Sequence, residues 1–194
     1  MKIAVFASGE GTNAEAIIRR LNAPGSPHSV SLVVTDRPGA GVISRADRHG
    51  VPVEIISRKM LADEKLFKTI LLKHAVEFIA LGGFLAMIPE WLIDAFPERI
   101  VNIHPSLLPR HGGKGMYGHR VHEAVIASGD TESGISIHYV DKEYDSGKLI
   151  FQASTRVMPG DTANDVEQRV RTLELAHYPE VVASLLDSFP QPVH

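Results

Sequence analysis

Apolar segments that alternate between strand-like and helix-like patterns dominate the first hundred residues. Short apolar runs with the length and β-branched content of buried strands occur at residues 1–7, 30–35, 51–56, 78–81 and 100–103. Segments with helical periodicity lie between them, at 14–21, 41–49, 61–74 and 89–95. Strands joined by helices of this length predict an α/β fold with a doubly wound, mostly parallel sheet and right-handed crossovers.

The rhythm changes after Pro109. Residues 110–118 contain four glycines and predict a loop. The remaining expected elements are a helix at 121–128, strands at 135–139 and 149–157, and a last helix that starts at the capping box Thr162-x-x-Asp165 and runs to about residue 188. No repeat or linker interrupts the chain, so we expect one domain over residues 1–194.

A glycine-rich turn follows the first strand. Gly9-Glu10-Gly11-Thr12-Asn13-Ala14 matches G-x-G-x-x-A, and Asp36 closes the second strand where the ribose-binding acid of a dinucleotide enzyme would lie. The amides of a helix N-terminus attract any phosphate, so a nucleotide monophosphate would be served equally well. The pattern predicts phosphate binding but leaves open which molecule carries the phosphate. A tight turn that binds no ligand is the remaining alternative.

The segment from Val101 to Pro109 places polar groups at a strand end. Pro105 cannot donate to a strand ladder, so the backbone leaves the sheet just after His104. Asn102 and His104 are two residues apart and share one face of the strand. An amide and an imidazole at the carboxyl end of a parallel strand lie where open α/β sheets build their sites. The alternative is a histidine satisfied within a turn.

Asp145 lies in a short polar loop, just before Ser146-Gly147. Asp and Gly favour turns, so a surface turn is the default interpretation. The functional alternative is that Asp145 faces His104, raises the pKa of the imidazole and holds its ring and tautomer.

Metal, thiol and polyanion chemistry receive little support. His119 and His122 could share a helix face beside Glu123, but zinc needs a third ligand and a second shell, so we expect solvated helix residues and no metal. The absence of cysteine excludes disulfides and thiolate catalysis.

A net charge of −3 without a basic run argues against nucleic acid or a membrane surface as the main partner. The apolar N-terminus is too short for a signal peptide, which predicts a cytoplasmic protein.

Three motifs occur in a characteristic order. They are Ser-Gly-Glu-Gly-Thr-Asn at 8–13, Asn-Ile-His-Pro-Ser-Leu-Leu-Pro at 102–109, and Ser-Gly-Ile-Ser-Ile-His at 133–138 leading to Asp-Ser-Gly at 145–147. Together they resemble the phosphoribosylglycinamide formyltransferases, folate-dependent enzymes of purine biosynthesis. The octapeptide at 102–109 is typical of the folate-dependent formyltransferases as a superfamily. The motif at 8–13 narrows the resemblance to the members that act on glycinamide ribonucleotide. The resemblance extends from the first strand to Glu174.

The resemblance implies a Rossmann-like formyltransferase fold with an antiparallel C-terminal portion. Residues up to about 100 would hold the phosphate and ribonucleotide, and residues from about 101 to 190 would supply catalysis and the folate side. The implied reaction moves a formyl group from 10-formyltetrahydrofolate to the amine of N1-(5-phospho-D-ribosyl)glycinamide. The implied partners are small molecules only, without metal, nucleic acid or membrane, for a monomer or homodimer.

The resemblance also implies particular site residues. The catalytic trio would be Asn102, His104 and Asp145, in which Asn102 and a protonated His104 stabilise the oxyanion, and His104 or a water near Asp145 moves the proton. The residues for the substrate would be Gly11, Thr12 and Asn13 at the phosphate, and Arg171, Thr172, Leu173 and Glu174 at the ribosyl-glycinamide end. The residues for the folate would be Leu85, Ala86, Met87 and Ile88, with Asn102 and the wall Asp141, Lys142, Glu143, Tyr144 and Asp145. Ala86 stands where some members carry arginine, and the loop at 112–118 is longer than in the best-known members.

Four other functions compete with this reading. The sister enzyme acting on initiator methionyl-tRNA adds a C-terminal RNA-binding domain, and 10-formyltetrahydrofolate hydrolase adds an N-terminal domain, so the chain length disfavours both. An NAD-dependent oxidoreductase would rest on the Gly9–Ala14 turn and Asp36. A ligand-binding module without catalysis would predict no turnover and no effect of changes at Asp145.

Overall fold

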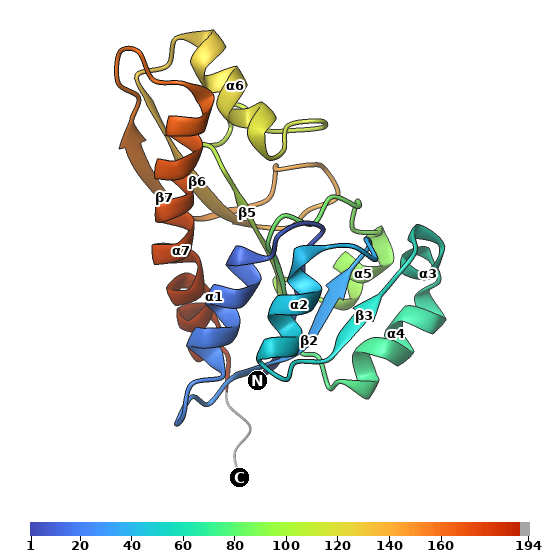
Figure 1. Cartoon of the computed structure of the whole chain (residues 1–194). Helices are drawn as coiled ribbons and strands as arrows, with labels where there is room; N and C mark the ends of the chain where they lie inside the picture. Colours follow the sequence, from blue (N-terminus) through green and yellow to red (C-terminus); the bar gives the residue numbers. More distant parts are fainter. Residues whose placement is uncertain (191–194) are drawn as a thin grey trace.

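Within residues 1–190, which this computed structural model describes, a seven-stranded sheet forms the centre of the molecule, in the order β3-β2-β1-β4-β5-β6-β7 (Figure 1). The strands are β1 Lys2–Phe6, β2 Ser29–Thr35, β3 Val53–Ile55, β4 Phe78–Leu81, β5 Ile100–His104, β6 Glu132–Tyr139 and β7 Leu149–Arg156. The first five strands pair in parallel, whereas β6 and β7 are antiparallel to their neighbours. The predicted fold class, including the antiparallel C-terminal portion, is confirmed.

The described part of the chain contains seven helices, of which the first six lie between strands and the last follows β7. They are α1 Thr12–Leu21, α2 Gly41–Arg48, α3 Arg58–Ala62, α4 Glu64–Lys73, α5 Glu90–Ala95, α6 His119–Ser128 and α7 Ala163–Ser188. The prediction of a single helix at 61–74 is wrong, because α3 and α4 are separated at Asp63. This residue adopts an extended conformation, and its carboxylate caps α4 by accepting from the Leu66 amide at 3.0 Å. The capping box predicted at Thr162 and Asp165 is present.

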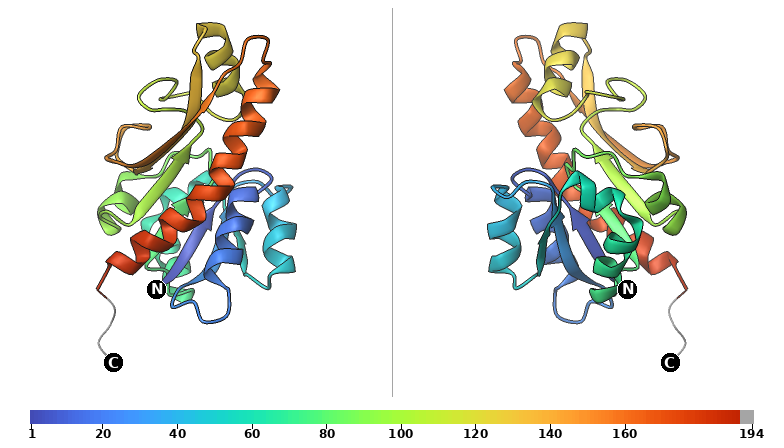
Figure 2. Two further views of the ribbon diagram at one scale, coloured as in Figure 1. Left: turned by 90° about the vertical axis from the view of Figure 1, so that its left-hand side faces the viewer. Right: turned by 90° about the vertical axis from the view of Figure 1, so that its right-hand side faces the viewer.

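Two hydrophobic cores cover the two faces of the sheet. Alternate residues of β1 separate them, since Ile3 and Val5 belong to one core and Ala4 and Phe6 to the other. Helices α1, α2 and α7 pack on the first face, and α3, α4 and α5 on the second (Figure 2). No helix among residues 1–190 is long and apolar enough to span a membrane.

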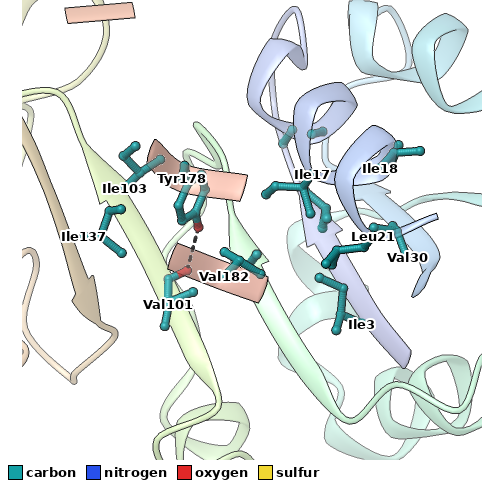
Figure 3. Close-up of a cluster of buried hydrophobic side chains, with 14 of the residues drawn as sticks. Ile3, Ile17, Ile18, Leu21, Val30, Val101, Ile103, Ile137, Tyr178 and Val182 are labelled. Carbon is teal, nitrogen blue, oxygen red and sulfur yellow. Dashed lines mark hydrogen bonds between the residues drawn. The ribbon is translucent and has the colours of Figure 1, made fainter. Parts of the chain in front are cut away.

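The long helix α7 is tied to the strands that end at the site. Tyr178 of α7 is fully buried, and its hydroxyl proton is shared between the carbonyl of Leu81 at 2.8 Å and that of Val101 at 3.3 Å. Figure 3 shows the contact with Val101. These carbonyls belong to β4 and β5. A single phenol therefore fixes α7 against two neighbouring strands, at the last residue of β4 and the second residue of β5.

Candidate active site

A pocket of about 400 Å³ opens at the carboxyl ends of β1, β4 and β5. This is the edge at which open α/β sheets bind ligands, and the volume lies in the range of small-molecule sites. Five segments line it: the turn at 8–13, residues 81–88 after β4, residues 102–105 at the end of β5, the loop at 113–118 and residues 140–145 after β6.

The turn at 8–13, for which the sequence predicts phosphate binding and which is called the phosphate turn below, leads from β1 into α1. Gly11 adopts a left-handed conformation with φ of +74°, and a Cβ there would lie 2.5 Å from the Val42 side chain. The Val42 amide donates to the carbonyl of Gly9 at 3.1 Å, so α2 supports the turn from behind. Thr12 and Asn13 form the first turn of α1, where backbone amides lack partners within the helix. The geometry therefore suits a phosphate.

The structure brings Asn102, His104 and Asp145 together. Asn102 and His104 share one face of β5, as their spacing predicts, and Nδ1 of His104 lies 3.5 Å from Oδ2 of Asp145. Asp145 reaches this position from a turn in which its φ is +55°. Its Oδ2 also accepts from the Gly113 amide at 2.9 Å. The loop at 113–118 is thus connected to the same carboxylate.

His138 is a fourth member of this cluster that was not predicted as a site residue; in the sequence it is the last residue of the motif at 133–138. It lies directly opposite Asn102 in the β5–β6 pairing. Its Nδ1 donates to the Tyr139 carbonyl at 2.9 Å, so in the neutral ring Nε2 accepts from Nδ2 of Asn102 at 3.2 Å. Nε2 also lies 3.6 Å from Oδ1 of Asp145. Its place in that motif was an available signal, but the pairing with Asn102 across the two strands was needed to place it in the site.

Burial decides the charge state of His104. It lowers the pKa of this imidazole, and the opposing effects of the Asp145 charge and of the hydrogen bond to the His111 carbonyl do not compensate. Asp145 does raise the pKa of His104, as expected, but the prediction of a raised pKa is wrong because burial lowers it by more. Burial also raises the pKa of Asp145, yet His138, His104 and the Gly113 amide together lower it. Near neutral pH the pair is therefore a neutral imidazole beside a carboxylate.

The predicted folate residues lie along one side of the pocket. Leu85, Ala86, Met87 and Ile88 line it, and residues 141–145 form the facing wall. The Leu85 amide is held by the Ser8 hydroxyl at 2.9 Å, which ties this segment to the phosphate turn. On the facing wall, Lys142 reaches Glu90 of α5 at 3.1 Å.

Of the four residues predicted at the ribosyl-glycinamide end, only Glu174 lines the pocket. Its carboxyl group accepts from Nδ2 of Asn13 at 3.2 Å, and burial raises its pKa to about 7. Arg171 lies in a shallow hollow on the outer side of α1. Thr172 is exposed, and Leu173 packs against the core. Successive residues of a helix point about 100° apart, so the four could not face one pocket.

Several pocket residues were not predicted. Arg37 follows β2, whereas Met116 and Tyr117 belong to the glycine-rich loop, and all three line the pocket. The position of Arg37 after a parallel strand was an available signal. Asp36, on which the dinucleotide alternative depended, does not line the pocket.

The expectation of two solvated histidines on α6 is wrong for His122. His119 is half exposed and lies 2.6 Å from Glu167, but His122 is only 3% exposed, on the inner face with Val121 and Val125. Among residues 1–190, no three histidine, aspartate or glutamate side chains are grouped so that they could hold a metal ion.

The sheet, the phosphate turn and the Asn102–His104–Asp145 cluster define a class of protein. The chain matches the family model described as formyl transferase over residues 1–182, and it belongs to that family. Within it, the resemblance to phosphoribosylglycinamide formyltransferases is confirmed. The protein of that name from Bacillus subtilis (strain 168) is 38% identical over 189 residues, which cover 95% of this chain and 94% of the relative.

Plant relatives and solved structures agree with this assignment. The chloroplastic phosphoribosylglycinamide formyltransferase of Arabidopsis thaliana is 39% identical over 96% of this chain. The chain spans 65% of that relative and 61% of the corresponding protein of Vigna unguiculata. The crystal structure of phosphoribosylglycinamide formyltransferase from Bacillus halodurans has a TM-score of 0.86 at 34% identity, covering 97% of this chain and 96% of the other.

Proposed function

We propose that this chain transfers a formyl group from 10-formyltetrahydrofolate to the amine of N1-(5-phospho-D-ribosyl)glycinamide, a step of de novo purine (IMP) biosynthesis. One observation carries the proposal. The Asn102–His104–Asp145 cluster lies in a single pocket, between a phosphate-binding turn at 9–13 and the segments at 85–88 and 141–145. Two substrates that enter from these two ends would bring an amine and a formyl group to the same imidazole.

The phosphate end matches a ribonucleotide. Gly11, Thr12 and Asn13 would hold the phosphate through backbone amides, and Glu174, fixed by Asn13, would bind the ribose or the glycinamide. Arg171 and Thr12 line the same surface hollow, and Arg171 would add positive charge to this end. Thr172 and Leu173 have no direct role in this proposal.

The opposite end matches a folate. Leu85, Ala86, Met87 and Ile88 offer apolar side chains and strand-end backbone groups to a flat heterocycle, and residues 141–145 close the other side. Ala86 leaves more room there than an arginine would. We expect the formyl group to lie beside Asn102.

The chemistry requires an acceptor and a donor for one proton. The amine attacks the formyl carbon, a C–N bond forms, and the carbonyl electron pair becomes an oxyanion to which the Asn102 amide donates. The neutral His104 removes a proton from the attacking nitrogen, and the Asp145 carboxylate stabilises the resulting imidazolium. His104 then returns this proton to N10 of the folate as the C–N10 bond breaks. The step needs no covalent intermediate, which accords with a chain that contains no cysteine.

We place the reaction in the cytoplasm, catalysed by a monomer or homodimer whose only partners are its small-molecule substrates. The test is formyl transfer measured with and without the ribonucleotide, for the wild type and for His104→Ala. Turnover that requires the ribonucleotide and disappears in the variant would support the proposal. Release of tetrahydrofolate without the acceptor would show a hydrolase, and an unchanged rate in a folded His104→Ala would remove His104 from the mechanism.

A further inference from the structure

The second ring nitrogen of His104 has a partner outside the pocket. Nε2 lies 2.8 Å from the backbone carbonyl of His111, a residue that does not line the pocket. A carbonyl oxygen can only accept a hydrogen bond, so Nε2 carries a proton whether the ring is neutral or charged. Nδ1, which faces Asp145, is then the nitrogen that gains and loses a proton.

The backbone at His111 is held in an unfavourable conformation. Its φ is +54°, in the left-handed region that residues with a side chain seldom adopt, although histidine is among those that tolerate it best. The preceding residue is fixed as well, since the Ser106 hydroxyl donates to the Arg110 carbonyl at 2.6 Å. Interactions beyond the turn must stabilise this geometry.

The ring of His111 supplies one of these interactions. Its Nε2 lies 2.7 Å from Oδ2 of Asp130, the second residue after α6, and both side chains are largely buried. The hydrogen bond from His111 lowers the pKa of Asp130, so the carboxylate stays charged. The guanidinium of Arg110 lies 3.6 Å from both Asp130 and Glu132. The turn is thus anchored to the end of α6 and the start of β6.

We propose that His111 is a positioning residue: its ring, anchored on Asp130, holds its own carbonyl against Nε2 of His104 and thereby reserves Nδ1 for proton exchange. The catalytic consequence rests on the function proposed above, whereas the protonation pattern of His104 does not. Without the anchor, the turn relaxes and Nε2 loses its acceptor. The neutral ring then favours a proton on Nδ1, bonded to Asp145, and that nitrogen no longer accepts a proton from the amine.

The test compares His111→Phe with a matched control, His119→Phe. Phenylalanine keeps an aromatic ring at position 111 but cannot bond Asp130. His119 forms the same kind of histidine–carboxylate pair, with Glu167, yet does not contact His104. Proton and nitrogen NMR of ¹⁵N-labelled imidazoles reads which nitrogen of His104 is protonated, with His104→Gln used to assign the signals.

In the wild type and in His119→Phe, we expect the neutral His104 ring to carry its proton on Nε2. In His111→Phe, a population protonated on Nδ1 should appear, and kcat should fall by on the order of tenfold while both KM values stay unchanged. Asp130→Asn provides a second variant with the same expected direction, should His111→Phe fail to fold. Unchanged His104 signals in the folded variants would overturn the proposal. Because the NMR measurement needs no substrate, it tests the protonation pattern of His104 even if the protein transfers no formyl group.

Discussion

Oδ2 of Asp145 lies 3.5 Å from Nδ1 of His104, although the two residues come from separate segments, the end of β5 and the turn between β6 and β7. His104 is almost completely buried, so water screens this contact poorly. The carboxylate is the main influence that opposes the lowering of the His104 pKa by burial. The charge of Asp145 therefore tunes the proton affinity of the proposed catalytic base.

Replacing Asp145 by Asn tests this coupling. Asparagine keeps the shape of the side chain and tolerates the positive φ of +55°, so the fold should persist. Loss of the charge should lower kcat by about 10²–10⁴-fold, the range of general acid–base catalysis. It should also lower the pKa of His104, so the acidic limb of kcat/KM against pH should move to lower pH. An acidic limb in the same position as in the wild type would contradict the prediction.

Replacing Glu174 by Gln should stabilise the protein at alkaline pH. The folded-state pKa of about 7 lies above the ordinary 4.5, so the folded state binds the extra proton. Stability therefore decreases as the pH rises from 4.5 through 7, by up to about 3 kcal/mol. Glutamine mimics the neutral form at every pH. Urea titrations at pH 5 and pH 8 should show little difference between the two proteins at pH 5 and a gain for Glu174→Gln at pH 8.

The same variant should bind the ribonucleotide less tightly at pH 8, because glutamine lacks the negative charge with which the Glu174 carboxylate accepts stronger hydrogen bonds there. The expected result is a raised KM for the ribonucleotide with the KM for the folate unchanged. A loss of stability at pH 8 would show that the carboxylate is the form that the fold requires.

Two glycines of the phosphate turn form a matched pair. Gly11 needs its left-handed conformation and has no room for a Cβ, whereas a Cβ on Gly9 would meet nothing within 4 Å. Gly11→Ala should lower the free energy of unfolding by more than 1 kcal/mol. Gly9→Ala should change it by less than about 0.5 kcal/mol. Thermal unfolding with and without inorganic phosphate measures both effects, and stabilisation by phosphate should be lost only in Gly11→Ala.

Local patterns predicted the parallel part of the sheet and the two site residues on β5. Strand and helix periodicity in the first hundred residues sufficed for the parallel portion, and the period of two placed Asn102 and His104 on one face. The antiparallel portion was stated as what the resemblance implies. The short loop between the strands expected at 135–139 and 149–157 favours a hairpin, but a helix precedes β6, so nothing local indicates that β6 runs antiparallel to β5. The break at Asp63 was missed because the apolar positions on either side of it look like one continuous helical pattern, in which a capping residue does not stand out.

The rest of the site depends on contacts between distant segments. Asp145 reaches His104 only because β6 pairs beside β5 and a positive φ turns the loop back. His138 joins the cluster through its register with Asn102, and His122 is buried because the inner face of α6 packs on the core. The pKa of His104 was misjudged for the same reason. A neighbouring charge can be named from a motif, but the degree of burial that outweighs it is a property of the assembled fold.

Replacing Asn102 by Ala separates two roles of its amide. In the structure Nδ2 donates to His138, and in the proposed mechanism the same group donates to the oxyanion. Loss of an oxyanion donor lowers kcat by about 10²–10³-fold, with little change in either KM. If Asn102 acted only by holding His138, His138→Gln would reduce kcat equally, and the double variant would be no worse than either single one. We expect instead that Asn102→Ala is much the more damaging change, and that adding His138→Gln lowers kcat further; steady-state kinetics of the three variants decides between the roles.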